Sequence, residues 1–199
     1  MKNWKIGLGL ISIGIVISLH LYSKNNILQK ELSIKNQELE NVNRRFDIQV
    51  HYSSYFKFEP NLKLRKADID SSREVFLKNE IKSNTFVLFI DKFNCDSCID
   101  TCIKMMNTKL TSGFKTIIFT TGFNLREINN FRSNKNLSFE VYQLSNLPRF
   151  IEKVKNAGFP FYFLINANFE ASNIFFPEKE SNLDDKYFSN INKIMGNLR

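Results

Sequence analysis

This chain of 199 residues has few of the residues that build several common kinds of site. It contains only three cysteines, two histidines, seven glycines and four prolines. Three cysteines cannot form the disulfide framework of a domain this large. The histidines, His20 and His51, both lie toward the N-terminus, which argues against a Ser/His/Asp catalytic arrangement. No glycine-rich phosphate loop or nucleotide fingerprint occurs, so the sequence gives no sign of a nucleotide-dependent enzyme.

Long runs of one charge are also missing. The formal net charge is +8, but Lys and Arg are interleaved with Asp and Glu, and basic runs such as Arg44-Arg45 never exceed two residues. A scattered basic excess is typical of a solvated surface, so no nucleic-acid partner is expected. Hydrophobic residues make up 43% of the chain, and 20 residues are Phe. The chain is therefore globular rather than disordered.

The N-terminus carries a membrane signal. Lys2 and Lys5 precede an uncharged stretch over residues 6–22, which as a helix spans about 25 Å. No small-x-small cleavage site follows it, so residues 1–23 are predicted as a cytoplasmic tip and an uncleaved transmembrane signal anchor. Because Lys2 and Lys5 favour a cytoplasmic N-terminus, we expect a single-pass protein of the cell (inner) membrane, with its C-terminal domain in the periplasm or another extracytoplasmic space.

Residues 24–48 are predicted as an amphipathic helical stalk. Their apolar residues recur at spacings of four, seven, three and four: Leu28, Leu32, Leu39, Val42 and Phe46. Such a helix could be a plain spacer or a short coiled coil, which leaves a homodimer through the stalk as an open prediction. Residues 49–66, which include Pro60, are predicted as a linker. The main domain is expected over 67–199.

Helical and strand patterns alternate in the main domain. A helix is expected first, over 68–79, and a nearly continuous apolar run over 85–91 then predicts a strand that is buried on both faces. Further strands are expected over 114–122 and 137–145, and a hairpin over 159–176. Helices are expected over 98–110, 124–134, 147–158 and 182–195. This order predicts an α/β fold with a central mixed sheet flanked by helices.

All three cysteines fall in one stretch, "FNCDSCIDTC", directly after the first buried strand. Cys95 lies where a helix begins, so unpaired amide N–H groups and the helix dipole would stabilise its thiolate. Cys98 follows one turn later, near enough to close a disulfide. The sequence therefore predicts Cys95 as the attacking thiol and Cys98 as the thiol that resolves the mixed disulfide.

Cys102 is the odd thiol, one turn further along the same helix. It could be a buried core residue, a third redox partner that exchanges with Cys98, or one of three sulfur ligands of a metal ion. A metal site on this fold would also be expected to recruit a histidine, and neither His20 nor His51 is suitably placed. We therefore expect no metal.

The order of elements and the stretches "FVLFIDKFNCDSC" and "GFPFYFLINANFE" resemble the thioredoxin fold, and more narrowly the membrane-anchored TlpA-like thiol–disulfide oxidoreductases. The resemblance covers residues 67–199. It implies that Pro160 follows a cis peptide bond and lies against the disulfide, and that Phe159 and Pro160 hold the substrate. A plainer interpretation is that Pro160 only begins a strand. The resemblance also implies no cofactor, an exported cysteine-containing substrate, and a membrane redox partner for recycling.

Several positions depart from the thioredoxin pattern, among them the residues between the two cysteines, where "CDSC" stands in place of CGPC and lacks the proline. Asn94 stands where an aromatic residue precedes the first cysteine, Phe89 stands where a buried acid acts as proton shuttle, and Asp96 beside Cys95 opposes thiolate formation. The preferred hypothesis is a membrane-anchored, extracytoplasmic thiol–disulfide oxidoreductase. The alternative is a non-enzymatic binding or scaffolding module of the same fold, whose disulfide is structural or sensing.

Overall fold

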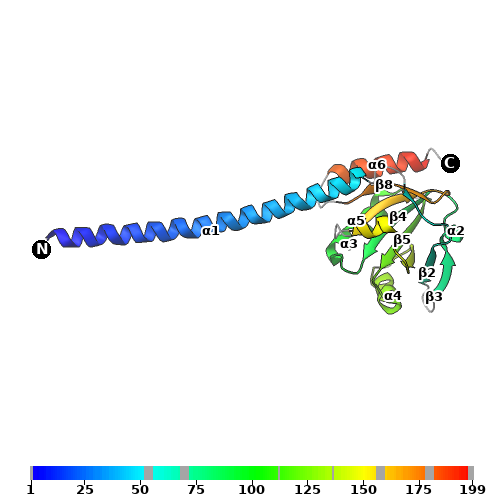
Figure 1. Cartoon of the computed structure of the whole chain (residues 1–199), viewed down its shortest axis with the longest axis horizontal. Coiled ribbons are helices and arrows are strands. Elements are labelled where there is room, and N and C mark those ends of the chain that lie inside the picture. Colours follow the sequence, from blue (N-terminus) through cyan, green and yellow to red (C-terminus); the bar gives the residue numbers. More distant parts are fainter. Residues whose placement is uncertain are drawn as a thin grey trace. The chain divides into compact units, whose positions relative to one another are not determined.

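The computed structural model of the chain describes residues 2–51, 56–67, 72–111, 113–135, 137–155, 160–177 and 182–196. Residue contacts divide the chain into two compact units, Met1–Arg44 and Arg45–Arg199. Figure 1 shows the elements along the chain. The helices are α1 (Lys2–His51), α2 (Leu77–Glu80), α3 (Asp96–Lys109), α4 (Leu125–Asn134), α5 (Arg149–Lys155) and α6 (Asn182–Gly196). The strands are β1 (Phe56–Lys57), β2 (Lys63–Ala67), β3 (Ser72–Phe76), β4 (Thr85–Asp91), β5 (Lys115–Thr121), β6 (Glu140–Leu144), β7 (Phe161–Ile165) and β8 (Glu170–Phe175).

Helix α1 includes the residues predicted as anchor and stalk. Its predicted apolar face is exposed to solvent, with Leu28, Leu32 and Leu39 all more than half exposed. Among the residues that the structure describes, no helix is both long and apolar enough to cross a membrane. The side chains of residues 1–16 lie outside that description, so the structure does not support the predicted anchor, which stays a prediction.

One mixed sheet contains all the described strands, in the order β1-β8-β7-β4-β5-β6-β2-β3. The central strand β4 pairs in parallel with β5, where Val87 lies opposite Ile117, and antiparallel with β7, where it lies opposite Phe163. Strand β6 continues the parallel part beside β5. The predicted α/β architecture with a mixed central sheet is therefore confirmed.

Alternate residues of β4 enter two separate cores. Val87 and Phe89 belong to one core cluster, which α5 covers with Phe150, Ile151 and Val154. Phe86, Leu88 and Ile90 belong to the other, to which α3, α4 and α6 contribute apolar residues. All seven residues of β4 are buried, as expected for a strand that is covered on both faces.

The predicted helix over 68–79 is wrong. Ser72–Phe76 form strand β3, which pairs with β2 over five residue positions, and among the described residues from 72 to 80 only Leu77–Glu80 are helical. Residues 68–71 lie outside the described residues. Strand β3 lies at the edge of the sheet and contacts a strand on one side only, so its side chains show no strong apolar alternation. The residues predicted as a linker, 49–66, contribute β1 and most of β2 to the sheet.

The other predicted elements are present with shifted ends. Asn124 caps α4 through a reciprocal capping box with Glu127. Helix α5 begins after Pro148, two residues later than predicted, and the Pro148 carbonyl accepts from the Glu152 N–H at 3.1 Å. Its predicted end at Gly158 lies outside the described residues. The hairpin turns where expected, with the Asn166 side chain accepting from two backbone N–H groups of the turn.

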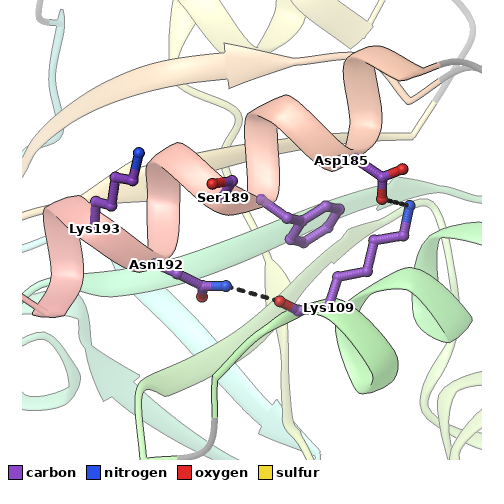
Figure 2. A pocket seen from close by; sticks show the side chains of 6 residues that line it. Lys109, Asp185, Ser189, Asn192 and Lys193 are labelled. Carbon is purple, nitrogen blue, oxygen red and sulfur yellow. Dashed lines mark hydrogen bonds and ion pairs between the residues drawn. The ribbon is translucent and has the colours of Figure 1, made fainter.

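Helix α6 holds the C-terminal end of α3 (Figure 2). The side-chain amide of Asn192 donates to the Lys109 carbonyl at 2.9 Å and accepts from the Thr111 N–H at 3.1 Å. Asp185, two turns before Asn192 in the same helix, forms an ion pair with Lys109 at 2.7 Å. The pocket drawn in Figure 2 lies between these contacts, so it belongs to the junction that fixes α3 on the sheet.

Substituting Asn192→Ala should destabilise the domain by about 1–2 kcal/mol, because one side chain pairs two backbone groups at the helix end. The free energy of unfolding in urea measures this. Asn190→Ala, at an exposed position of the same helix, is the matched control and should change stability by less than about 0.5 kcal/mol. Equal effects of the two substitutions would contradict the role of Asn192 in holding the end of α3.

Candidate active site

The site is built on a disulfide between Cys95 and Cys98, whose Cα atoms lie 5.2 Å apart. This is the pair that the CxxC spacing predicted. Cys95 is the N-cap residue of α3 and has an extended backbone, with φ −69° and ψ 137°. The chain leaves the buried strand β4, turns over three residues and enters the helix at this cysteine. The disulfide thus lies where the C-terminal end of a buried strand meets the N-terminus of a helix.

The electrostatic surroundings of Cys95 favour a negatively charged sulfur. Its Sγ atom accepts from the Cys98 N–H at 3.1 Å, and the Ser97 hydroxyl lies 3.5 Å away. Both contacts come from the first turn of α3, where the helix dipole is positive. After reduction, the same donors would stabilise a Cys95 thiolate. Asp96 opposes this effect, but it is exposed, so water and salt screen its charge.

The two cysteine residues differ in solvent exposure. Cys95 is exposed, whereas Cys98 is half-buried. Beside them Phe93 is 85% exposed, which is high for a large apolar side chain. Sequence reasoning found no aromatic directly before Cys95 and missed Phe93 one position earlier. Only its place outside a periodic apolar pattern could have indicated that it faces solvent.

The turn before Cys95 is fixed by Asp91 and Asn94, both buried. The Asn94 side-chain carbonyl accepts from the Asp91 N–H at 2.7 Å, while the Asn94 N–H donates to the Asp91 carbonyl at 2.9 Å. The Asp91 carboxylate accepts from the Phe93 N–H at 2.9 Å. Asn94, which stands where an aromatic residue was expected, therefore has a structural role in this chain.

Ion pairs connect the same turn to two helices. Asp91 pairs with Lys155 at the end of α5 at 3.1 Å, and Lys92 pairs with Glu127 of α4 at 2.8 Å. The hydrogen bond from Lys92 is the main cause of a lowered pKa of the Glu127 carboxyl group. Gly122 adjoins this turn with φ +80°, and a Cβ atom there would come within 3.0 Å of the Lys92 Cβ. Glycine thus permits the close approach of the two loops.

Pro160 is buried and directly precedes β7. The first residue of β7, Phe161, lies opposite Phe89 of β4, so Pro160 lies at the edge of the sheet from which the cysteine turn emerges. The register therefore brings Pro160 near the end of β4 where the cysteine turn begins, and its predicted contact with the disulfide stays a prediction. Phe159 lies outside the described residues, and so does the peptide bond that joins it to Pro160.

Cys102 lies one turn inside α3, with 1% of its surface exposed. The Tyr162 hydroxyl donates to its backbone carbonyl at 2.8 Å. Burial raises the pKa of the Cys102 thiol to about 12. A protonated, inaccessible thiol is a poor nucleophile, which favours the core interpretation over a third redox partner. In the described part of the chain, no three His, Cys, Asp or Glu side chains are placed to hold a metal ion.

Phe89 has a clear packing role. Its ring stacks on that of Phe161 of the neighbouring strand, with centroids 4.9 Å apart. Both belong to the α5-side core. The buried carboxylate of this region is instead Asp91, two positions further along the same face of β4.

Comparison with known proteins agrees with this architecture. No protein-family profile matches the chain, and no curated protein matches its sequence. Among solved structures, a candidate protein disulfide isomerase from Bacteroides thetaiotaomicron is similar over 72% of this chain and 91% of its own, with TM-score 0.50 and 12% identity. A thioredoxin-like protein from Porphyromonas gingivalis covers 70% and 90%, with TM-score 0.47 and 15% identity. A thiol:disulfide interchange protein from Chlorobium tepidum covers 65% and 93%, with TM-score 0.41 and 17% identity.

The chain therefore has a thioredoxin-like α/β fold with a CxxC disulfide at a helix N-terminus. At this level of identity the likeness shows the fold alone. The narrower resemblance to TlpA-like membrane-anchored proteins stays a prediction.

Cys102 should resist alkylation in the native protein and react after unfolding. Its pKa rises from 9.0 to about 12 on folding, so the unfolded chain releases this proton at a lower pH than the native chain. The resulting stabilisation is fully present below pH 9 and is lost as the pH rises to about 12.

Iodoacetamide labelling followed by mass spectrometry tests the accessibility of Cys102. The free energy of unfolding of the wild type and of Cys102→Ala, measured between pH 8 and 11, tests the pH dependence. The variant should lose less stability over that range than the wild type. Rapid native labelling of Cys102 would contradict its burial.

Proposed function

We propose that this protein is a thiol–disulfide oxidoreductase that uses the Cys95–Cys98 pair. The observation that carries the proposal is the exposed residue Cys95 at the N-cap of α3, whose Sγ is bonded to that of a half-buried Cys98. Cys95 is the cysteine that a substrate can reach. Cys98 is placed to be the leaving thiolate when Cys95 is attacked and the resolving thiol in the reverse direction. A structural disulfide has no need of this asymmetry.

The exchange is balanced in both directions. When the protein oxidises, a substrate thiolate attacks Cys95 Sγ, the Cys95–Cys98 bond breaks, and its electron pair goes to the Cys98 sulfur, which takes up a proton. A second substrate thiolate then attacks the substrate sulfur of the mixed disulfide and releases the Cys95 thiolate. The substrate has gained a disulfide, and the protein holds two thiols. Reduction of a substrate disulfide follows the same steps in reverse, with Cys98 resolving.

Two features support a place for substrate near Cys95. Phe93 offers an exposed aromatic surface, and Pro160 lies at the same sheet edge. We include the Phe159–Pro160 segment in the substrate-binding surface, where backbone groups would pair with an extended peptide. The substrate would be an exported, cysteine-containing protein.

The same proposal places the protein at a membrane. The N-terminal segment would be a single-pass anchor, and the domain would lie on the extracytoplasmic side, where disulfides form and persist. Its disulfide or dithiol would be regenerated by a membrane partner that carries its own redox-active dithiol. The exposed apolar face of α1, with Leu28, Leu32 and Leu39, supports a second copy of the chain as a further partner.

A second candidate function is a non-enzymatic binding module with a structural or sensing disulfide. The absence of an acid at position 89, where Phe89 packs in the core, favours it. Exposure of Cys95 and its contact with the Cys98 N–H favour the enzyme. The two functions differ in whether a covalent adduct with another protein forms.

A Cys98→Ser variant should accumulate mixed disulfides with substrate proteins through Cys95, because the one other thiol, Cys102, is buried and cannot resolve them. Adducts that run as larger species on a non-reducing gel and disappear with dithiothreitol are the expected result. The Cys95→Ser variant should form none. Cys102→Ser is the matched control and should behave like the wild type. If Cys98→Ser accumulates no adduct, the binding module is the better description.

A reporter enzyme that folds only after export, fused to the C-terminus of the full chain, should be active. Removing residues 1–23 should abolish that activity and release the fusion from the membrane fraction, because the anchor also serves as the export signal. If a second reporter, one that is active only in the cytoplasm, is active at the C-terminus instead, the domain lies on the cytoplasmic side and exported substrates are ruled out.

A further inference from the structure

The carboxylate of Asp91 lies at the end of the central strand with 4% of the residue exposed. A buried carboxylate is costly unless it is paired, so a charge at this place needs compensation by its neighbours. Its two oxygens have different partners. Oδ1 accepts from the Phe93 N–H at 2.9 Å. Oδ2 accepts no hydrogen bond from the described residues and has the Lys155 ammonium group at 3.1 Å as its ion-pair partner.

The first contact acts on the chain that enters the active helix. Phe93 is two residues before Cys95, and the bond to Asp91 fixes its peptide group. Asn94 is fixed to the backbone of Asp91 by two further hydrogen bonds. Because the turn has few remaining degrees of freedom, the direction in which the chain reaches Cys95 is set by Asp91 and Asn94 together.

The second contact acts on the helix that leads to Pro160. Lys155 is the last residue of α5 and precedes Pro160 by only five positions. Helix α5 packs on the same face of β4 as the Asp91 side chain, through Ile151 and Val154. The ion pair therefore joins the turn that carries the cysteine to the end of the helix that precedes the proposed substrate-binding segment.

We propose that Asp91 is a positioning residue of the CxxC site, acting with Lys155. It touches neither sulfur, and its effect passes through the Phe93–Asn94 turn to the Cys95 N-cap. Holding that turn keeps Cys95 Sγ on the Cys98 N–H, the contact that favours its thiolate. The inference rests on the proposed function and adds a residue that the CxxC motif does not contain.

The test measures the reduced protein. Alkylation of Cys95 by iodoacetamide is followed at the pH where the wild-type thiol is half ionised, with Cys98→Ser and Cys102→Ser present in every variant so that one thiol reports. Asp91→Leu removes both contacts and should slow alkylation by about tenfold. Asp91→Asn keeps an acceptor for the Phe93 N–H and should lose about threefold, as should Lys155→Met. The Asp91→Asn, Lys155→Met double variant should be no slower than either single variant, because both remove one interaction.

Lys92→Met is the matched control. It removes a lysine from the same turn and breaks the partly exposed pair with Glu127, and it should alkylate like the wild type. Thermal unfolding of each variant separates positioning from stability. If Asp91→Asn and Lys155→Met lower the melting temperature but leave the alkylation rate within about 1.5-fold of the wild type, or if Lys92→Met slows alkylation equally, the positioning role is wrong.

This result is separate from the proposed function. Alkylation requires only a reduced Cys95, whereas the proposed function requires exchange with another protein. A chain that forms no adducts but shows the expected order of alkylation rates would keep the positioning role and lose the enzyme.

Discussion

The structure depends on the burial of β4 from both sides. Every residue of this strand is buried, so its backbone groups need hydrogen-bond partners. Strands β5 and β7 supply them along most of β4, Asn94 supplies them at Asp91, and the apolar side chains of β4 enter one of two cores. The chain can become polar only where the strand ends. That place is occupied by Asp91, and the cysteine turn begins directly after it. The cysteines therefore lie at the first place after the buried strand where the chain can reach solvent.

Rigid surroundings give this exposed sulfur a defined geometry. Helix α3 is held on the sheet by buried residues of its inner face, among them Ile99, Cys102 and Met106, and at its far end by Asn192. A helix that is fixed at both ends presents its first-turn N–H groups in one direction. The thiolate-stabilising contact at Cys95 thus follows from packing some distance away, and Cys102 contributes to it as a core residue.

Much of this could be read from the sequence. The apolar run over 85–91, the CxxC spacing and the helical spacing of Cys102 predicted the central strand, the disulfide and the buried thiol. The β2–β3 pair could not be predicted, because β3 carries little apolar alternation and β2 is held in the sheet by β6, a segment distant in the sequence. The Asp91–Lys155 pair was missed for a similar reason. Sixty-four positions separate the two residues, and only the fold brings α5 to the end of β4.

The departures from the thioredoxin pattern fit one another once the contacts are known. Phe89 faces a core in which Phe161 stacks on it, so a carboxylate at that position would be buried among apolar rings without a cation. Two residues further along the same face, the side chain reaches the end of α5, where Lys155 can pair with it. The Asn94 side chain in turn accepts a hydrogen bond from the Asp91 N–H, which an aromatic side chain could not accept. In this chain the buried acid at position 91 and the amide at position 94 therefore belong together, because both hold the turn that leads to Cys95.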